Sequence, residues 1–333
     1  MGTAVNTIRA VNKRKFITPA IYAGLLVILC LIPVLNVSPY YLHILIMTFF
    51  YIVAVSSLRL IITSGQLPLA HGAFMGIGAY SSGILAMQLN WTPWITIPLG
   101  GLIAAAIGTF IGYPFARLRA MYYALASLFF GQGMIQVLLA LDKLTNGYHG
   151  LTGIPGLLPT ISKLPYYYLI LAFVIVCLIA IYRVEHSRIG TNLKAIAQSH
   201  MVASSVGINE AEYRILVLTG GCFFAGLAGA AYAHYSQALS TTNFDLNATL
   251  WLYIYGWIGG IGSFAGPIVG TALLMIAPEL LRVLKQYVPY ISAVILVIVV
   301  YAMPKGLAGL PELVSSWYAD LKKNKKTINA RSN

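Results

Sequence analysis

The chain has 333 residues, of which 59% are hydrophobic and 9% are charged, and its mean hydropathy is +0.80. Soluble globular domains carry about a quarter charged residues, so this composition excludes a soluble enzyme or binding domain and places the chain among membrane proteins. The net charge of +13 does not indicate a nucleic-acid partner, because the basic residues lie between apolar runs and not on a soluble face.

Apolar runs follow one another along the whole chain, separated by short polar segments. A membrane-spanning helix needs about 20 apolar residues, and the alternating pattern of β-barrel strands is absent from the sequence. We therefore expect an all-α, polytopic transmembrane helical bundle of about 8–10 spans, with broken or half-length segments. The run at 250–262 is the half-length candidate, because it is short and ends in glycines. The runs cover residues 17–35, 40–62, 67–88, 93–115, 120–141, 166–182, 214–237, 250–262, 265–282 and 288–303.

The Lys and Arg residues are distributed unevenly between the two sides that these spans define. If the N-terminus is cytoplasmic, seventeen of the 21 lie inside, and the outer four are Lys143, Lys163, Arg282 and Lys285. The positive-inside rule therefore predicts a multi-pass membrane protein with cytoplasmic N- and C-termini, whose basic residues meet anionic membrane lipids.

Three regions of different character follow from this topology. We expect a basic cytoplasmic N-terminus at 1–16, a transmembrane domain at 17–303 and a basic cytoplasmic tail at 304–333. The outer loop at 142–165 is rich in Gly and Pro and predicts an ordered irregular segment. The inner loop at 183–213 is the sizeable polar stretch on the cytoplasmic side.

Helical spacing inside this inner loop predicts a short amphipathic helix that stops near Gly207. The residues that follow the spacing are Leu193, Ile196, Ala197, His200, Met201 and Ser204.

The sequence lacks the residues that would energise transport within this chain. Ion-coupled transporters need ionisable groups inside the membrane, yet seven of the eight acidic residues are predicted to lie in loops or tails, and the eighth, Glu279, is close to Arg282. No phosphate-binding G-x-x-x-x-G-K-[ST] loop occurs, and the six His residues are scattered. We therefore expect no catalytic, cofactor-binding or metal-binding residues here, and an energy source on another chain.

The segment at 65–72 combines Pro68 with the polar residues Gln66 and His71 at membrane depth. A broken backbone at that depth must be buried in protein or line a water-filled cavity. Two interpretations have equal weight from the residues alone: a translocation path, or an interfacial loop that leads into the next helix.

Four motifs follow one another along the chain: GQLPLAHGAFMGIGAY at 65–80, the polar segment at 188–209, GGIGSFAGP at 259–267 and PKGLAG at 304–309. In this order they resemble the LivM-like permeases of branched-chain amino acid ABC importers. GQLPLAHGAFMGIGAY at 65–80 is similar to the first signature of that family, and 188–209 resembles its cytoplasmic loop. GGIGSFAGP at 259–267 and PKGLAG at 304–309 resemble its GGxGSxxGP and PxGLxG motifs. The chain departs from the pattern at Pro68 and Ala70, where Ser and Gly are usual, and in the cytoplasmic loop, where acidic residues are usual.

The resemblance implies a permease subunit in the plasma membrane of a bacterium. It would form a heterodimer with a sister permease and work with two ATPase subunits and an extracytoplasmic substrate-binding protein. The resemblance places ATPase docking in the loop at 183–213. The docking residues that we expect are Leu193, Ile196, Ala197, Met201, Ala203 and Gly207. The translocation path that we expect involves Gln66, His71, Gly259 and Gly262.

Two alternatives remain for the function. Related permeases carry urea, short amides or aromatic acids, so the cargo can differ from branched-chain amino acids. A channel or facilitator that works without ATP belongs to a different class. It would need a selectivity element repeated by symmetry, and nothing in the sequence resembles one.

Overall fold

The computed structural model describes residues 29–31, 33, 38–118, 120–159 and 162–280, together with residues 287, 290, 293, 294, 297 and 306. The predicted N-terminal region 1–16, nearly all of the predicted tail, and most of the first and last predicted spans lie outside the described residues. The described part is helical apart from loops and one pair of two-residue strands. The predicted all-α class of a polytopic membrane bundle is confirmed.

Five helices of the described part are long and apolar enough to cross a membrane. They are α2 (Pro39–Ile62), α4 (Pro93–Phe115), α5 (Ala120–Ala140), α7 (Lys163–Glu185) and α10 (Glu210–Ser236). The shorter apolar helices are α3 (His71–Gln88), α11 (Leu246–Gly259) and α12 (Ala265–Leu280), while α6 (Asp142–Thr145), α8 (Arg188–Gln198) and α9 (His200–Ser205) are connecting helices. The remaining elements are the 3-10 helices η2 (Gly147–His149) and η3 (Thr241–Phe244) and the strands β1 (Leu151–Thr152) and β2 (Ala238–Leu239).

Local sequence explains where several helices begin. Pro39 and Pro93 lie at the starts of α2 and α4, where a missing backbone N–H costs nothing and the fixed φ favours the helix. The carboxylate of Asp245 caps α11 by accepting a hydrogen bond from the backbone N–H of Ala248, at 3.0 Å. Glu210 and Glu212 occupy the first turn of α10, where the helix dipole stabilises negative charge.

The core forms where α3, α4 and α10 pack against one another. Small residues allow this close packing: a methyl group on Gly100 of α4 would lie 2.7 Å from the carbonyl oxygen of Gly78 and 3.1 Å from Cβ of Ala230. Helix α2 packs between this group and α7, and most of its residues are buried, including Phe50 and Leu58.

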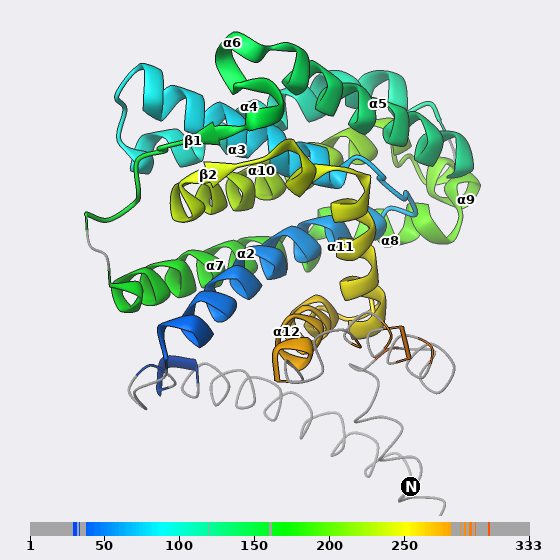
Figure 1. Cartoon of the computed structure of the whole chain (residues 1–333). Coiled ribbons are helices and arrows are strands. Elements are labelled where there is room, and N and C mark those ends of the chain that lie inside the picture. Colours follow the sequence, from blue (N-terminus) through cyan, green and yellow to red (C-terminus); the bar gives the residue numbers. More distant parts are fainter. Residues whose placement is uncertain are drawn as a thin grey trace, which may run out of the picture.

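The bundle has two distinct ends (Figure 1). At one end, here called the α8 end, α8 and α9 connect α7 to α10. At the other, here called the β end, β1 and β2 form an antiparallel pair in which Leu151 lies opposite Leu239. Helices α2 and α7 run side by side between these ends and finish at the α8 end.

The chain turns back into the bundle after α10. From β2 the segment runs beside α3, where the ring of Phe244 packs edge-on to that of Tyr80 at 6.3 Å and fills the space left by Gly76. The Thr249 hydroxyl then accepts a hydrogen bond from the backbone N–H of Gly72, at 2.9 Å. Helix α11 therefore begins beside the first turn of α3 and has only 14 residues, so the predicted half-length segment is confirmed.

Candidate functional site at the α8 end

The inner loop forms two short helices where the sequence predicted one. Ser199 has extended backbone angles, φ −161° and ψ 108°, and its hydroxyl caps α9 by accepting a hydrogen bond from the backbone N–H of Val202. The prediction of one continuous helix is therefore wrong at Ser199. Its hydroxyl accepts a hydrogen bond from a free backbone N–H at the start of α9, and this favours a helix start over a continued helix. The stop near Gly207 is confirmed, since Gly207 adopts φ +84°.

One side of α8 and α9 is attached to the bundle. The side chains of Leu193, Ile196 and Ala203 are 0%, 3% and 2% exposed. The amide of Asn192 donates a hydrogen bond to the Tyr213 hydroxyl on α10, at 2.7 Å. Three of the expected docking residues therefore pack inside this chain and hold the two helices in place.

The opposite side of α9 is exposed and carries apolar side chains. Of the expected docking residues, Ala197, Met201 and Gly207 are exposed. Met201 is 73% exposed, and Val202 and Val206, which helical spacing did not single out, are 63% and 71% exposed. These residues form a surface that we call the α9 patch, defined by Met201, Val202 and Val206.

A buried group of charges lies behind α8. The guanidinium of Arg59, in the last turn of α2, forms a bidentate ion pair with the carboxylate of Glu185, and the Nη2 to Oε1 distance is 2.8 Å. The two side chains are 4% and 3% exposed. Lys194 of α8 is half-exposed and reaches the same carboxylate at 3.7 Å. The ion pair thus joins α2, α7 and α8.

The same guanidinium also contacts the connection between α11 and α12. Arg59 Nε donates a hydrogen bond to the carbonyl oxygen of Ile261, at 2.7 Å. The ring of Phe264 packs edge-on to that of Tyr182 on α7, with 5.1 Å between the ring centroids. The Gly-rich motif at 259–267 is therefore held against the ends of α2 and α7.

The expected path glycines occupy different surroundings. Gly259 is buried where α11 crosses α12, and a methyl group on it would collide with the carbonyl oxygen of Gly266. Gly262 is exposed, and a methyl group on it would meet nothing within 4 Å. Gly259 serves the crossing, whereas Gly262 lies on the surface of the connection.

The expected path residue Gln66 lies in the turn between α2 and α3. Gly65 has φ +79° and packs against Ala197 of α8, so this turn touches the inner loop. Gln66 is 2% exposed, and neither its amide oxygen nor its amide nitrogen has a hydrogen-bond partner among the described residues. An unpaired buried amide costs about 1–3 kcal/mol, which marks Gln66 as unusual.

His71 is fully buried between α2 and α3 and is held by its own chain. Its Nε2 lies 2.9 Å from the Ser57 hydroxyl and 3.0 Å from the carbonyl oxygen of Ala54. Because the Ser57 hydroxyl donates to the same carbonyl, Nε2 carries the proton and donates to this pair. His71 thus fixes the start of α3 against α2.

Sequence reasoning missed the ion pair. It treated Arg59 as an orientation marker and Glu185 as a loop residue. The structure corrects this, because α7 continues beyond the apolar run at 166–182 and ends at Glu185 inside the protein. Glu210 and Glu212, also predicted in the loop, are in the first turn of α10. The signal available in the sequence was an arginine at the end of a long apolar run.

The fold and this site define a multi-pass membrane protein in which a connecting loop is linked by buried charges to the ends of its membrane helices. Residues 40–304 match the model of the family described as branched-chain amino acid transport system, permease component. The chain belongs to this family, and the resemblance carried by its motifs is confirmed.

The curated relatives agree with this family. The chain is 27% identical to the high-affinity branched-chain amino acid transport system permease protein LivM of Salmonella typhimurium, over 90% of this chain and 79% of the relative. It is 25% identical to the corresponding permease protein LivH of Escherichia coli, over 75% of this chain and 87% of the relative. It is 25% identical to the autoinducer 2 import system permease protein LsrD of Salmonella typhi, with 79% and 82% covered. No solved structure gave a significant match.

Proposed function

We propose that this chain is a transmembrane permease subunit of an ATP-binding-cassette importer that translocates branched-chain or related amino acids. Its partners are a sister permease, two ATPase subunits and an extracytoplasmic binding protein. In this proposal the α8 end faces the cytoplasm and the β end faces outward, an orientation that the distribution of Lys and Arg favours. The relatives named LivM and LivH are two different permeases of such transport systems, which supports a heterodimer.

The observation that carries the proposal is the α9 patch. Exposed apolar side chains on a short helix outside the membrane spans mark a protein contact surface. Helix α9 packs on the bundle through Ala203, and the preceding α8 is held by Leu193, Ile196 and the Asn192–Tyr213 hydrogen bond. The two helices together can therefore transmit a displacement instead of bending. We propose that an ATPase subunit binds this patch and that its ATP-driven movement shifts α2, α7, α11 and α12 through the buried ion pair.

The experiment compares two acidic substitutions on the loop. Met201→Glu places a charge in the α9 patch, whereas Thr191→Glu places the same charge on an exposed position in the first turn of α8, where an acid suits the helix dipole. We expect Met201→Glu to abolish co-purification of the ATPase and ATP-dependent uptake, while Thr191→Glu retains both. Equal uptake in the two variants would refute docking at the patch.

The cargo remains a separate question within the same class. The relative LsrD belongs to an autoinducer 2 import system, so membership of this group of permeases does not itself define the cargo. Uptake of branched-chain amino acids, urea, short amides and aromatic acids by the reconstituted complex distinguishes them. Uptake that persists without ATP and without ATPase subunits would instead identify a channel or facilitator.

A further inference from the structure

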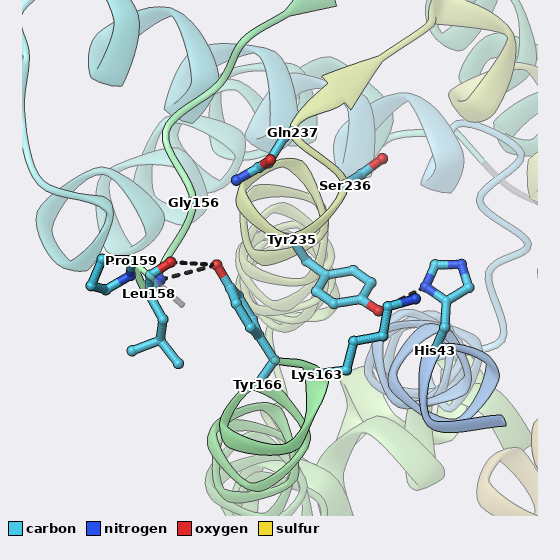
Figure 2. Close-up of a pocket in the computed structure, with 9 residues that line it drawn as sticks. All are labelled: His43, Gly156, Leu158, Pro159, Lys163, Tyr166, Tyr235, Ser236 and Gln237. Atoms are coloured by element: carbon cyan, nitrogen blue, oxygen red, sulfur yellow. Dashed lines mark hydrogen bonds between the residues drawn. The ribbon is translucent and has the colours of Figure 1, made fainter. Parts of the chain in front are cut away.

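A cavity of about 690 Å³ opens at the β end of the bundle (Figure 2). It lies between the start of α2, the loop before α7 with the first turn of α7, and the end of α10. Small-molecule sites have volumes of about 300–1,000 Å³, so the cavity is large enough for an amino acid or a headgroup.

The wall formed by the loop before α7 is fixed to α10. Gln237, which ends α10 with φ +57°, accepts hydrogen bonds through its carbonyl oxygen from the backbone N–H groups of Gly153 and Ile154, at 3.1 and 3.3 Å. The Tyr166 hydroxyl accepts a hydrogen bond from the backbone N–H of Leu158 and donates one to the carbonyl oxygen of the same residue, both at 3.0 Å. The cavity is therefore formed before any ligand arrives.

Two tyrosines and a histidine form the aromatic side of the cavity. The rings of Tyr166 and Tyr235 pack edge to face at 5.6 Å, and His43 stacks on Tyr235 at 5.5 Å. His43 Nδ1 and the Tyr235 hydroxyl are 2.7 Å apart and form a hydrogen bond. These hydroxyls are already engaged, so the rings offer a ligand mainly apolar surface.

The charge of the cavity is positive. Lys163 lines it and extends toward the Tyr235–His43 pair, and none of the described residues that line it is acidic. The sequence contains no Asp or Glu between Asp142 and Glu185 to neutralise this lysine locally. Lys163 is also the first residue of α7, whose helix dipole is positive here and whose start receives no side-chain hydrogen bond from Ser162.

We propose that this cavity binds one anionic oxygen group, a carboxylate or a phosphate, at Lys163, with the apolar part of the ligand against Tyr166 and Tyr235. The ligand is either a free carboxylate on its way to translocation or the headgroup of a membrane lipid. The inference extends the proposed function, which places the β end outside, but binding itself requires no ATP.

The experiment measures binding by calorimetry in the full complex, purified in a sugar detergent without the binding protein and without ATP. The probes are isovalerate, its neutral amide isovaleramide, and the short-chain lipid dihexanoylphosphatidylglycerol. We expect isovalerate or the lipid, but not the amide, to bind saturably. Lys163→Gln should weaken that binding by at least about tenfold, which corresponds to the loss of one charged hydrogen bond, and Lys163→Arg should retain it.

Lys143→Gln is the matched control, because Lys143 is an exposed lysine at the same end that does not line this cavity. Lys163-dependent binding of isovalerate identifies a free carboxylate as the ligand, and Lys163-dependent binding of the lipid alone identifies a headgroup. Equal binding of isovaleramide and isovalerate, or no difference between the Lys163→Gln and Lys143→Gln complexes, overturns the proposal. ATP-dependent uptake in the same complexes reports separately on the proposed function.

Discussion

Arg59 and Glu185 form a bidentate ion pair inside the protein, between the last turn of α2 and the last residue of α7. Transferring such charges out of water costs several kcal/mol for each, and packed apolar residues would serve stability equally well. Unlike apolar residues, the ion pair links several helices through directed hydrogen bonds. One guanidinium holds α7 through Glu185 and the α11–α12 connection through Ile261, while Lys194 links the same carboxylate to α8.

Removing one partner of this pair should destabilise the protein strongly. Glu185→Gln leaves the Arg59 charge buried without its carboxylate, and we expect the free energy of unfolding to fall by about 3–5 kcal/mol. The double variant Arg59→Met with Glu185→Leu removes both charges and should recover most of this loss. Unfolding in mixed micelles measures both values. Lys194→Met is the control, because Lys194 is half-exposed and its pair contributes at most about 1 kcal/mol.

Replacing Arg59 by Lys tests coupling apart from charge. An ammonium keeps the positive charge but lacks the planar fork that bonds the Glu185 carboxylate and the Ile261 carbonyl together. We expect the Arg59→Lys chain to assemble with its ATPase subunits. We expect its ATP-dependent uptake to fall by roughly tenfold, a factor within the range that typical coupling free energies produce. Co-purification and uptake are measured on one preparation. Wild-type uptake in this variant would show that the pair is structural only.

A methyl group should be tolerated at Gly262, in the connection between α11 and α12, but not at Gly266, where the two helices cross. Gly266→Ala directs a Cβ into the carbonyl oxygen of Gly260, so the helices must separate, and we expect a loss of about 1–3 kcal/mol in unfolding free energy. Gly262→Ala meets nothing within 4 Å and should change stability by less than about 0.5 kcal/mol. Thermal unfolding compares the two. Similar losses in both variants would contradict the crossing geometry.

Apolar run length predicted most of the helices, because a membrane leaves the backbone few alternatives to helix. The start of α4 at residue 93 coincides with the start of its apolar run, and the short α11 was predicted from the glycines that end its run. The extent of α7 was underestimated, because its last turn contains polar residues that pair inside the protein, and hydropathy cannot distinguish a buried Glu185 from a solvated one.

Residues of the candidate site were predicted less well than the helices that hold them. Helical spacing correctly found that the inner loop has an apolar side, but Leu193 and Ile196 turn it toward the bundle. The α9 patch arises because Ser199 interrupts the helix and restarts it with Met201 and Val202 outward. This change of direction depends on the extended backbone conformation of Ser199, which cannot be predicted from the spacing of apolar residues.

Gln66 and His71 were predicted together as path residues, and the structure gives them different surroundings. His71 donates from Nε2 to Ser57 and Ala54, so its removal takes from the start of α3 its link to α2, although its Nδ1 has no partner in the described part of the chain. The Gln66 amide has no partner in the described part of the chain, so the folded state gains nothing from it. A buried polar side chain that lowers stability, as Gln66 does, is typical of a position that is kept for function.

Substitution of each residue by an apolar one of similar size should therefore separate stability from transport. We expect Gln66→Met to leave the unfolding free energy unchanged or to raise it by about 1 kcal/mol, because it removes an unpaired buried amide, yet to reduce ATP-dependent uptake. His71→Leu should lower stability by about 0.5–1.5 kcal/mol, since it removes the hydrogen bond by which Nε2 joins α3 to the Ser57–Ala54 pair of α2. Thermal unfolding and uptake are measured on both variants. If Gln66→Met transports like the wild type, Gln66 belongs to an interfacial loop and the path lies elsewhere.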